Sequence, residues 1–197
     1  MDINILNKIA VKMVADSKGI LAIDESHGTC KKRFDALNIN VTEENRRSYR
    51  DMLISANSLS DYISGVILFD ETIRQKTSDG STFPDYLNKV GIIPGIKVDA
   101  GAKPFSCHPG EKITEGLDGL TERMKEYSAL GAKFAKWRAV ISIGESMPSN
   151  ACMLANSHAL ARYASICQEI NIVPIVEPEV LMDGSHNIKQ CFEVTNT

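Results

Sequence analysis

The chain has 197 residues, of which 43% are hydrophobic and 24% charged, and its formal net charge is -3. This length and apolar content allow one or two domains with a buried core. The mild, mixed charge gives no electrostatic reason to expect nucleic acid or an anionic membrane as a partner. No apolar stretch approaches the length that crosses a bilayer. The first fifteen residues also lack the apolar region and cleavage site of a signal peptide.

The cysteine and histidine patterns indicate neither disulfides nor a metal site. The five cysteines are odd in number and contain no CxxC pair, and the four histidines form no HxH or HxxxH pair. We therefore expect reduced thiols, a cytoplasmic protein and no bound metal.

Five short segments rich in isoleucine and valine predict strands of a parallel sheet. Each is a continuous apolar run bounded by glycine, proline or a charge, as is typical of strands covered on both faces. In chain order they are Gly19–Asp24, Gly65–Asp70, Ile92–Asp99, Phe134–Val140 and Ile172–Val180.

Helical patterns separate these strands. Thr42 is a predicted N-cap, and acidic residues follow it in the first turn. The segment Leu117–Leu130 predicts a helix that ends at Gly131, and Ser149–Ile170 predicts the longest helix. We expect the first of these helices to bury Tyr49, Met52, Leu53 and Ala56, and we expect Ala100–Thr114 to form one long surface loop.

The alternation of strands and helices predicts an α/β fold with a parallel sheet, and the pattern alone fits a doubly wound sheet or a barrel. Polar residues decide between the two. They fall in or at the ends of all five strands, and a (β/α)8 barrel builds its active site from the carboxyl ends of several strands. The charged residues concerned are Asp24, Glu25, Asp70, Glu71, Lys97, Asp99, Lys136, Arg138, Glu177 and Glu179.

The segment Ile175–Glu179 contains a carboxylate in an unusual place. Glu177 follows an apolar run, where an ionised carboxylate is costly unless it is paired or works in a site. Such a group can serve as a general acid or base. The alternative is an ordinary strand end, where Pro178 stops the ladder and both glutamates are solvated.

Two strands carry cations among their apolar residues. Lys136 and Arg138 lie two residues apart, so both face the same side of their strand and could recognise an anion such as phosphate. The alternative is an amphipathic strand with basic tips that reach solvent. Lys97 repeats the pattern on the preceding predicted strand.

A loop of small residues joins the first strand to the next helix. Such a loop at a helix N-terminus can bind phosphate through backbone N–H groups and hydroxyls. An ordinary turn in which Ser26 or Thr29 caps the helix explains the pattern equally well. By default, Arg46 and Arg47 in the following helix lie on a solvated face.

Read together, the segments resemble class I fructose-bisphosphate aldolases. In chain order they are LAIDES, TEENRRSYR, GVILFDET, GIKVD, EGLDGL, GAKFAKWR, LARYASICQ and IVPIVEPE, and they cover Lys18 to Gln190. The resemblance implies a (β/α)8 barrel, a homotetramer, and no metal or other cofactor. It also implies reversible cleavage of fructose 1,6-bisphosphate through a Schiff base on a lysine.

The resemblance also assigns roles to individual residues. Asp24 would handle the C4 hydroxyl, Glu177 would be the general acid/base of imine chemistry, and Lys136, with Glu179 beside it, would hold the substrate. The groups expected around a substrate phosphate and the polyol are Ser26, Thr29, Arg33, Arg46, Lys97 and Arg138. His27 replaces a small hydroxyl residue that is usual in this loop of the family.

The main departure from the family is length. A complete barrel takes about 250 residues, with a floor near 200, and the family's Schiff-base lysine lies in a later LLKPNM-like motif that these 197 residues lack. We therefore expect residues 1–197 to form a single partial barrel domain that is inactive alone. Two alternatives stay open: a transaldolase-like or deoxyribose-phosphate-aldolase-like barrel whose lysine lies in this chain, and a non-catalytic structural or binding fragment.

Overall fold

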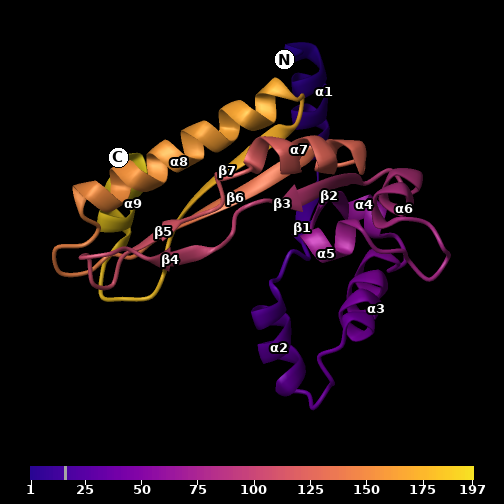
Figure 1. Cartoon of the computed structure of the whole chain (residues 1–197), viewed down its shortest axis with the longest axis horizontal. Coiled ribbons are helices and arrows are strands. Elements are labelled where there is room, and N and C mark those ends of the chain that lie inside the picture. Colours follow the sequence, from indigo (N-terminus) through magenta and orange to yellow (C-terminus); the bar gives the residue numbers. More distant parts are fainter. Residues whose placement is uncertain (16) are drawn as a thin grey trace.

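The computed structural model describes residues 1–15 and 17–197 and contains a five-stranded parallel sheet (Figure 1). The strand order is β1-β2-β3-β6-β7, so neighbours in the sheet follow one another along the chain. All five predicted strands are confirmed, with ends that shift by at most two residues. The strands are β1 (Gly19–Ala22), β2 (Ile63–Leu68), β3 (Ile93–Lys97), β6 (Phe134–Ile141) and β7 (Val173–Val180).

Helices connect the strands, and the longest, α8, packs along β6 and β7 (Figure 1). The predicted cap at Thr42 is confirmed, because its hydroxyl accepts a hydrogen bond from a backbone N–H in the first turn of α3, and Ser149 caps α8 in the same way. The helices are α1 (Ile3–Met13), α2 (His27–Asp35), α3 (Glu43–Ile54), α4 (Leu59–Tyr62), α5 (Asp70–Ile73), α6 (Phe83–Lys89), α7 (Leu120–Ala129), α8 (Asn150–Glu169) and α9 (Ile188–Asn196).

Two local predictions were wrong. The segment 100–114 contains an antiparallel pair of short strands, β4 (Ala102–Pro104) and β5 (Lys112–Thr114), rather than one continuous loop. Helix α3 buries Arg50, Asp51 and Ile54, whereas Met52 is 62% exposed. The buried face of α3 is therefore partly polar, because its arginines pair with carboxylates from neighbouring elements.

The sheet has an apolar layer on each side. On its outer face, Trp137 belongs to a large buried cluster between the strands and the helices. On its inner face, the Phe134 ring packs with Met13 of α1 and with Ile67 and Ile93. Gly95 makes room for this ring, because a Cβ atom there would overlap it.

The inner face becomes polar toward the carboxyl ends of the strands. Side chains two residues apart on a strand face the same side, so Phe134 is followed on that side of β6 by Lys136 and Arg138. On β7 the corresponding series runs from Ile175 to Glu177 and on to Glu179, and the pairing of the two strands sets Arg138 beside Glu177. The apolar layer thus lies beneath a cluster of charged side chains. We call it the charged cluster, and on these two strands it comprises Lys136, Arg138, Glu177 and Glu179.

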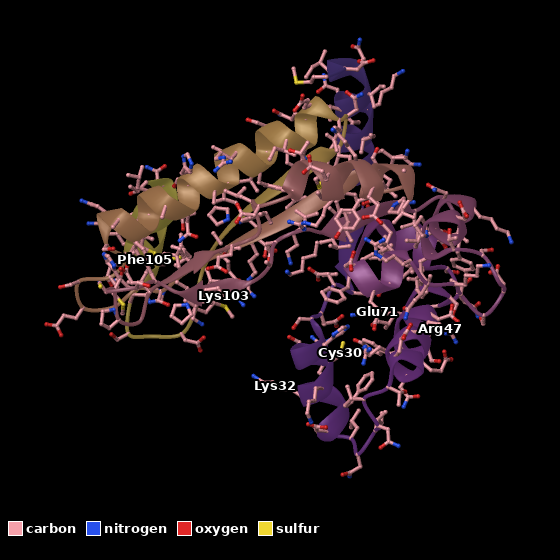
Figure 2. The ribbon with its side chains drawn as sticks, in the orientation of Figure 1. Cys30, Lys32, Arg47, Glu71, Lys103 and Phe105 are labelled. Carbon is pink, nitrogen blue, oxygen red and sulfur yellow. The ribbon has the colours of Figure 1, made fainter. Side chains whose placement is uncertain are left out.

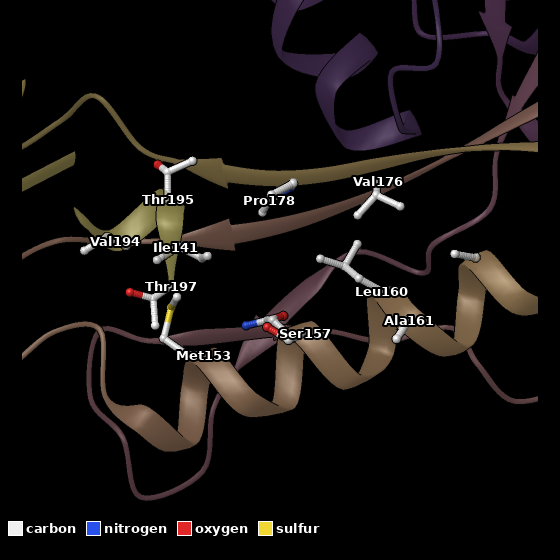
Figure 3. Close-up of a pocket in the computed structure, with 12 residues that line it drawn as sticks. Ile141, Met153, Ser157, Leu160, Ala161, Val176, Pro178, Val194, Thr195 and Thr197 are labelled. Atoms are coloured by element: carbon white, nitrogen blue, oxygen red, sulfur yellow. The ribbon is translucent and has the colours of Figure 1, made fainter. Parts of the chain in front are cut away.

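The outer face of β7 has a different character. Val176 and Pro178 alternate with the two glutamates and line a cavity of 340 Å³ that includes residues from α8 and α9 (Figure 3). Its lining is mainly aliphatic, and Leu160 of α8 contributes to it. Among the described residues, no helix is long and apolar enough to span a bilayer.

Candidate active site

Lys136 lies at the centre of the charged cluster. Its Nζ atom is 3.2 Å from Oδ2 of Asp24 and 3.5 Å from Oε2 of Glu177. Its side chain is only 12% exposed, so water screens these attractions weakly. One cation therefore joins two carboxylates from opposite edges of the sheet.

The contact between Lys136 and Asp24 requires a curled sheet. Asp24 follows β1, and three strand-to-strand steps separate β1 from β6. In a flat sheet these steps would span about 14 Å, too far for the two side chains to meet. The observed 3.2 Å contact places both groups inside one concave surface.

Glu177 occupies a setting that favours its neutral form. Burial raises the pKa of its carboxyl, and the nearby charge of Glu179 raises it further, while Lys136 and Arg138 oppose the shift. The net direction is upward. A carboxyl with a raised pKa can donate and accept protons closer to neutral pH, which general acid/base chemistry requires.

Arg138 joins the same cluster. Its Nε atom forms an ion pair with Glu179 and lies 3.9 Å from Oε1 of Glu177. Its backbone carbonyl accepts a hydrogen bond of 2.7 Å from the hydroxyl of Thr114. The short β5 strand, which the sequence did not predict, thus supports β6 at this position.

Lys97 borders the cluster on β3. The pairing of β3 with β6 sets Lys97 directly beside Lys136. Its Nζ atom lies 2.6 Å from Oδ1 of Asp99, whose other oxygen accepts a hydrogen bond of 3.4 Å from the backbone N–H of Arg138. Lys97 also lines a cavity of 700 Å³ together with Ser26.

Ser26 and Thr29 lie at the N-terminus of α2. The Ser26 hydroxyl caps the helix by accepting a hydrogen bond from the Thr29 backbone N–H, and the two hydroxyl oxygens are 3.2 Å apart. The capping alternative from the sequence is therefore confirmed for Ser26. Both residues are exposed. They lie at the N-terminal end of the helix, where free backbone N–H groups favour the binding of an anion.

Arg33 and Arg46 lie further from the centre and, within the described residues, do not contact Lys136 directly. Arg33 forms an ion pair with Glu25 and donates a 3.1 Å hydrogen bond to the Tyr49 hydroxyl. Arg46 donates two hydrogen bonds, of 2.8 and 2.5 Å, to Glu71. Its side chain is 11% exposed, so the expectation of a solvated face was wrong for Arg46.

Glu71 of α5, labelled in Figure 2, forms ion pairs with several cations from α2 and α3. Besides Arg46, it lies 3.5 Å from Arg50 and 3.3 Å from the imidazole of His27. The hydrogen bonds from Arg46 lower the pKa of its carboxyl, although burial opposes them. Arg50 is the residue that the sequence analysis missed. Its signal was the four-residue spacing from Arg46, which puts both arginines on one helix face.

Comparisons with known proteins agree with this arrangement. The family model described as class-I fructose-bisphosphate aldolase matches residues 5–197. A probable class 1 fructose-bisphosphate aldolase of Xanthomonas axonopodis is 63% identical over 195 residues, which cover 99% of this chain and 58% of that protein. Fructose-bisphosphate aldolase 1 of Toxoplasma gondii is 55% identical over 188 residues, covering 94% of this chain and 52% of that protein.

The fold has a close counterpart among solved structures. The fructose-bisphosphate aldolase of Plasmodium falciparum, solved in a ternary complex with TRAP and a small-molecule inhibitor, superposes with a TM-score of 0.94 at 50% identity. The match covers 98% of this chain and 56% of that one. The sheet is thus the curled part of a TIM barrel, and the predicted fold class is confirmed. The chain spans between one half and three fifths of the length of these relatives.

Proposed function

Because the chain belongs to the class I fructose-bisphosphate aldolase family, we propose that it forms the amino-terminal part of an enzyme that reversibly cleaves fructose 1,6-bisphosphate. The products are dihydroxyacetone phosphate and glyceraldehyde 3-phosphate, and the pathway is glycolysis or gluconeogenesis in the cytoplasm. The observation that carries the proposal is the position of Lys136 within 3.5 Å of both Asp24 and Glu177.

In this proposal the described residues perform the proton transfer and the electrostatic part of the reaction. A lysine amine condenses with the ketose carbonyl, and the resulting iminium accepts the electron pair of the breaking C3–C4 bond. Glu177 moves protons during formation and breakdown of the imine, and its raised pKa supports this role. Asp24 accepts a hydrogen bond from the C4 hydroxyl. Lys136 holds the substrate oxygens with its positive charge.

The remaining cations are assigned to the substrate phosphate and polyol. Each of the four has a carboxylate partner in the structure: Lys97 with Asp99, Arg138 with Glu179, Arg33 with Glu25, and Arg46 with Glu71. A phosphate dianion competes well for arginine, because its oxygens match the planar fork of donors. Binding therefore exchanges a carboxylate for a phosphate oxygen, and Ser26 and Thr29 add hydroxyl donors at the helix end.

We assign the imine-forming lysine to a later strand, in an LLKPNM-like segment that the family resemblance implies and that the 197 residues do not contain. We accordingly assign Lys97 and Lys136 to binding and electrostatics rather than to imine formation. The single partial barrel domain, residues 1–197, would be completed by further strands, and the complete protein would be a homotetramer.

A chimaera tests the proposal. Residues 1–197 are joined to the carboxy-terminal segment of the Xanthomonas axonopodis relative, which shares 63% identity over the common part. The proposal predicts cleavage of fructose 1,6-bisphosphate in the presence of a metal chelator. A folded chimaera without cleavage contradicts it and favours the non-catalytic alternative.

A further inference from the structure

The side chain of Arg50 is completely buried, yet no function has been attached to it so far. It lies on α3 and reaches across to the chain that follows β1. Its Nε atom donates a hydrogen bond of 3.1 Å to the carbonyl of Ile23, and its Nη2 atom donates one of 2.6 Å to the carbonyl of Glu25. These two carbonyls flank Asp24 on both sides.

The backbone at Asp24 lies at the point where the sheet stops supporting it. Strand β1 ends at Ala22, and the next hydrogen bond to β2 comes from the N–H of Ile23 to the carbonyl of Ile67, at 3.1 Å. The Arg50 guanidinium therefore continues the support beyond the strand. It holds the peptide group that precedes Asp24 and the peptide group that follows Glu25, and so restrains the backbone on either side of the Asp24–Glu25 pair.

The surroundings of Arg50 compensate its buried charge. Glu71 lies 3.5 Å away, and the guanidinium lies over the Phe69 ring at 5.4 Å from the centroid. Glu71 is also bonded to Arg46, so it would keep a cationic partner if Arg50 were replaced. Loss of Arg50 would chiefly leave the carbonyls of Ile23 and Glu25 without this donor.

We propose that Arg50 is a positioning residue that fixes the backbone around Asp24 and so holds the Asp24 carboxylate against Lys136. A rigid planar fork can bond two carbonyls at once, whereas a lysine ammonium offers a point charge on a flexible stem. A catalytic role for this positioning rests on the proposed function, since the proposed function is what assigns Asp24 and Lys136 to the reaction. The contact itself is testable without any substrate.

The test measures how fast Lys136 reacts with acetic anhydride in the 197-residue chain, by isotope labelling and peptide mass spectrometry. The exposed Lys125 on α7 serves as the internal reference. Arg50→Met frees Asp24, and we expect the labelling of Lys136 to rise about three- to tenfold, the scale for loss of a close, partly buried opposite charge. Asp24→Asn should give a similar rise, and Arg50→Lys an intermediate one.

A double-mutant cycle separates positioning from a general structural effect. If Arg50 acts through Asp24, Lys136 in the double variant Arg50→Met/Asp24→Asn is labelled no faster than in Asp24→Asn alone. If the two substitutions act independently, their effects on the labelling rate multiply. Arg47→Met is the matched control, because Arg47 lies on the same helix but bonds Glu44 and the carbonyl of Lys76. It should leave Lys136 unchanged.

Multiplicative effects overturn the proposal. So does Lys136 labelling within twofold of wild type in Arg50→Met, whether or not Asp24→Asn raises it. If the circular dichroism spectrum shows that Arg50→Met does not fold, the double-mutant cycle is run with Arg50→Lys in its place. Failure of the aldolase chimaera would leave the labelling result standing, so the two proposals fail separately.

Discussion

The amine of Lys136 lies 3.2 Å from the carboxylate of Asp24, although 112 residues separate them in the sequence. The contact crosses the inside of the curled sheet, from β6 to the end of β1. Glu177 on β7 approaches the same amine from the other edge, at 3.5 Å. A structure of about half a barrel therefore already assembles three charged groups that the sequence motifs placed on three separate strands.

Replacing Glu177 by glutamine should abolish most turnover in the chimaera. Glutamine keeps the shape of the side chain but cannot transfer a proton, and general acid/base groups typically contribute about 10²–10⁴ in rate. The measurement is kcat for fructose 1,6-bisphosphate cleavage. Glu169→Gln, at an exposed position on α8, is the matched control and should not change kcat. Equal kcat values for both variants would remove Glu177 from the mechanism.

The same substitution should change how stability depends on pH. Burial raises the pKa of Glu177 above its ordinary value of 4.5 in the folded chain. The folded state then binds the proton more tightly than the unfolded state, so the free energy of unfolding falls as pH rises from 4.5 through the raised pKa. Because Glu177→Gln does not titrate, its stability relative to wild type should increase over this window. Urea unfolding at several pH values measures this, and the opposite slope would contradict the pKa direction.

Gly95 should not tolerate alanine. A Cβ atom there would overlap the buried Phe134 ring inside the sheet, and overpacking of this kind costs about 1–3 kcal/mol. Gly19→Ala on β1 is the control, because a Cβ atom there meets nothing within 4 Å. Urea unfolding should show a clear loss for Gly95→Ala, little change for Gly19→Ala, and partial recovery when Phe134→Leu is added to Gly95→Ala. Equal stability of the two alanine variants would show that the ring does not fill this space.

The open sheet should make the 197-residue chain associate. In the part of the chain that the structure describes, β1 and β7 each pair with one neighbour, so each leaves a row of backbone groups along its outer edge. Unpaired edges of this kind template contacts with other chains. Size-exclusion chromatography should therefore show species larger than a monomer whose share grows with concentration. A monodisperse monomer across the concentration range would show that these edges are protected.

The strands and their polar ends could be predicted from the sequence because both signals are local. Continuous apolar runs marked the five strands, and the charges at Lys136 and Glu177 interrupted them where a buried strand should have none. The short strands β4 and β5 could not be predicted. Each has three residues, and Pro104 lies in one of them, so their composition is that of a loop.

The carboxylate partners of the arginines also could not be predicted from the sequence. Arg46 and Glu71 are 25 residues apart on different helices, and only the folded chain brings them together. For the same reason the burial of Arg50 was missed, since an arginine within a polar helix is normally solvated. Its role depends on two backbone carbonyls, which leave no trace in side-chain patterns.

Borohydride trapping tests the central claim most directly: that this chain supplies the charged groups of an aldolase site but not its imine-forming lysine. The chimaera and the 197-residue chain are each incubated with fructose 1,6-bisphosphate, reduced, and mapped by peptide mass spectrometry. We expect a label in the appended carboxy-terminal segment of the chimaera and none on the 197-residue chain. A label on Lys97 or Lys136 would contradict the account and make that lysine the nucleophile.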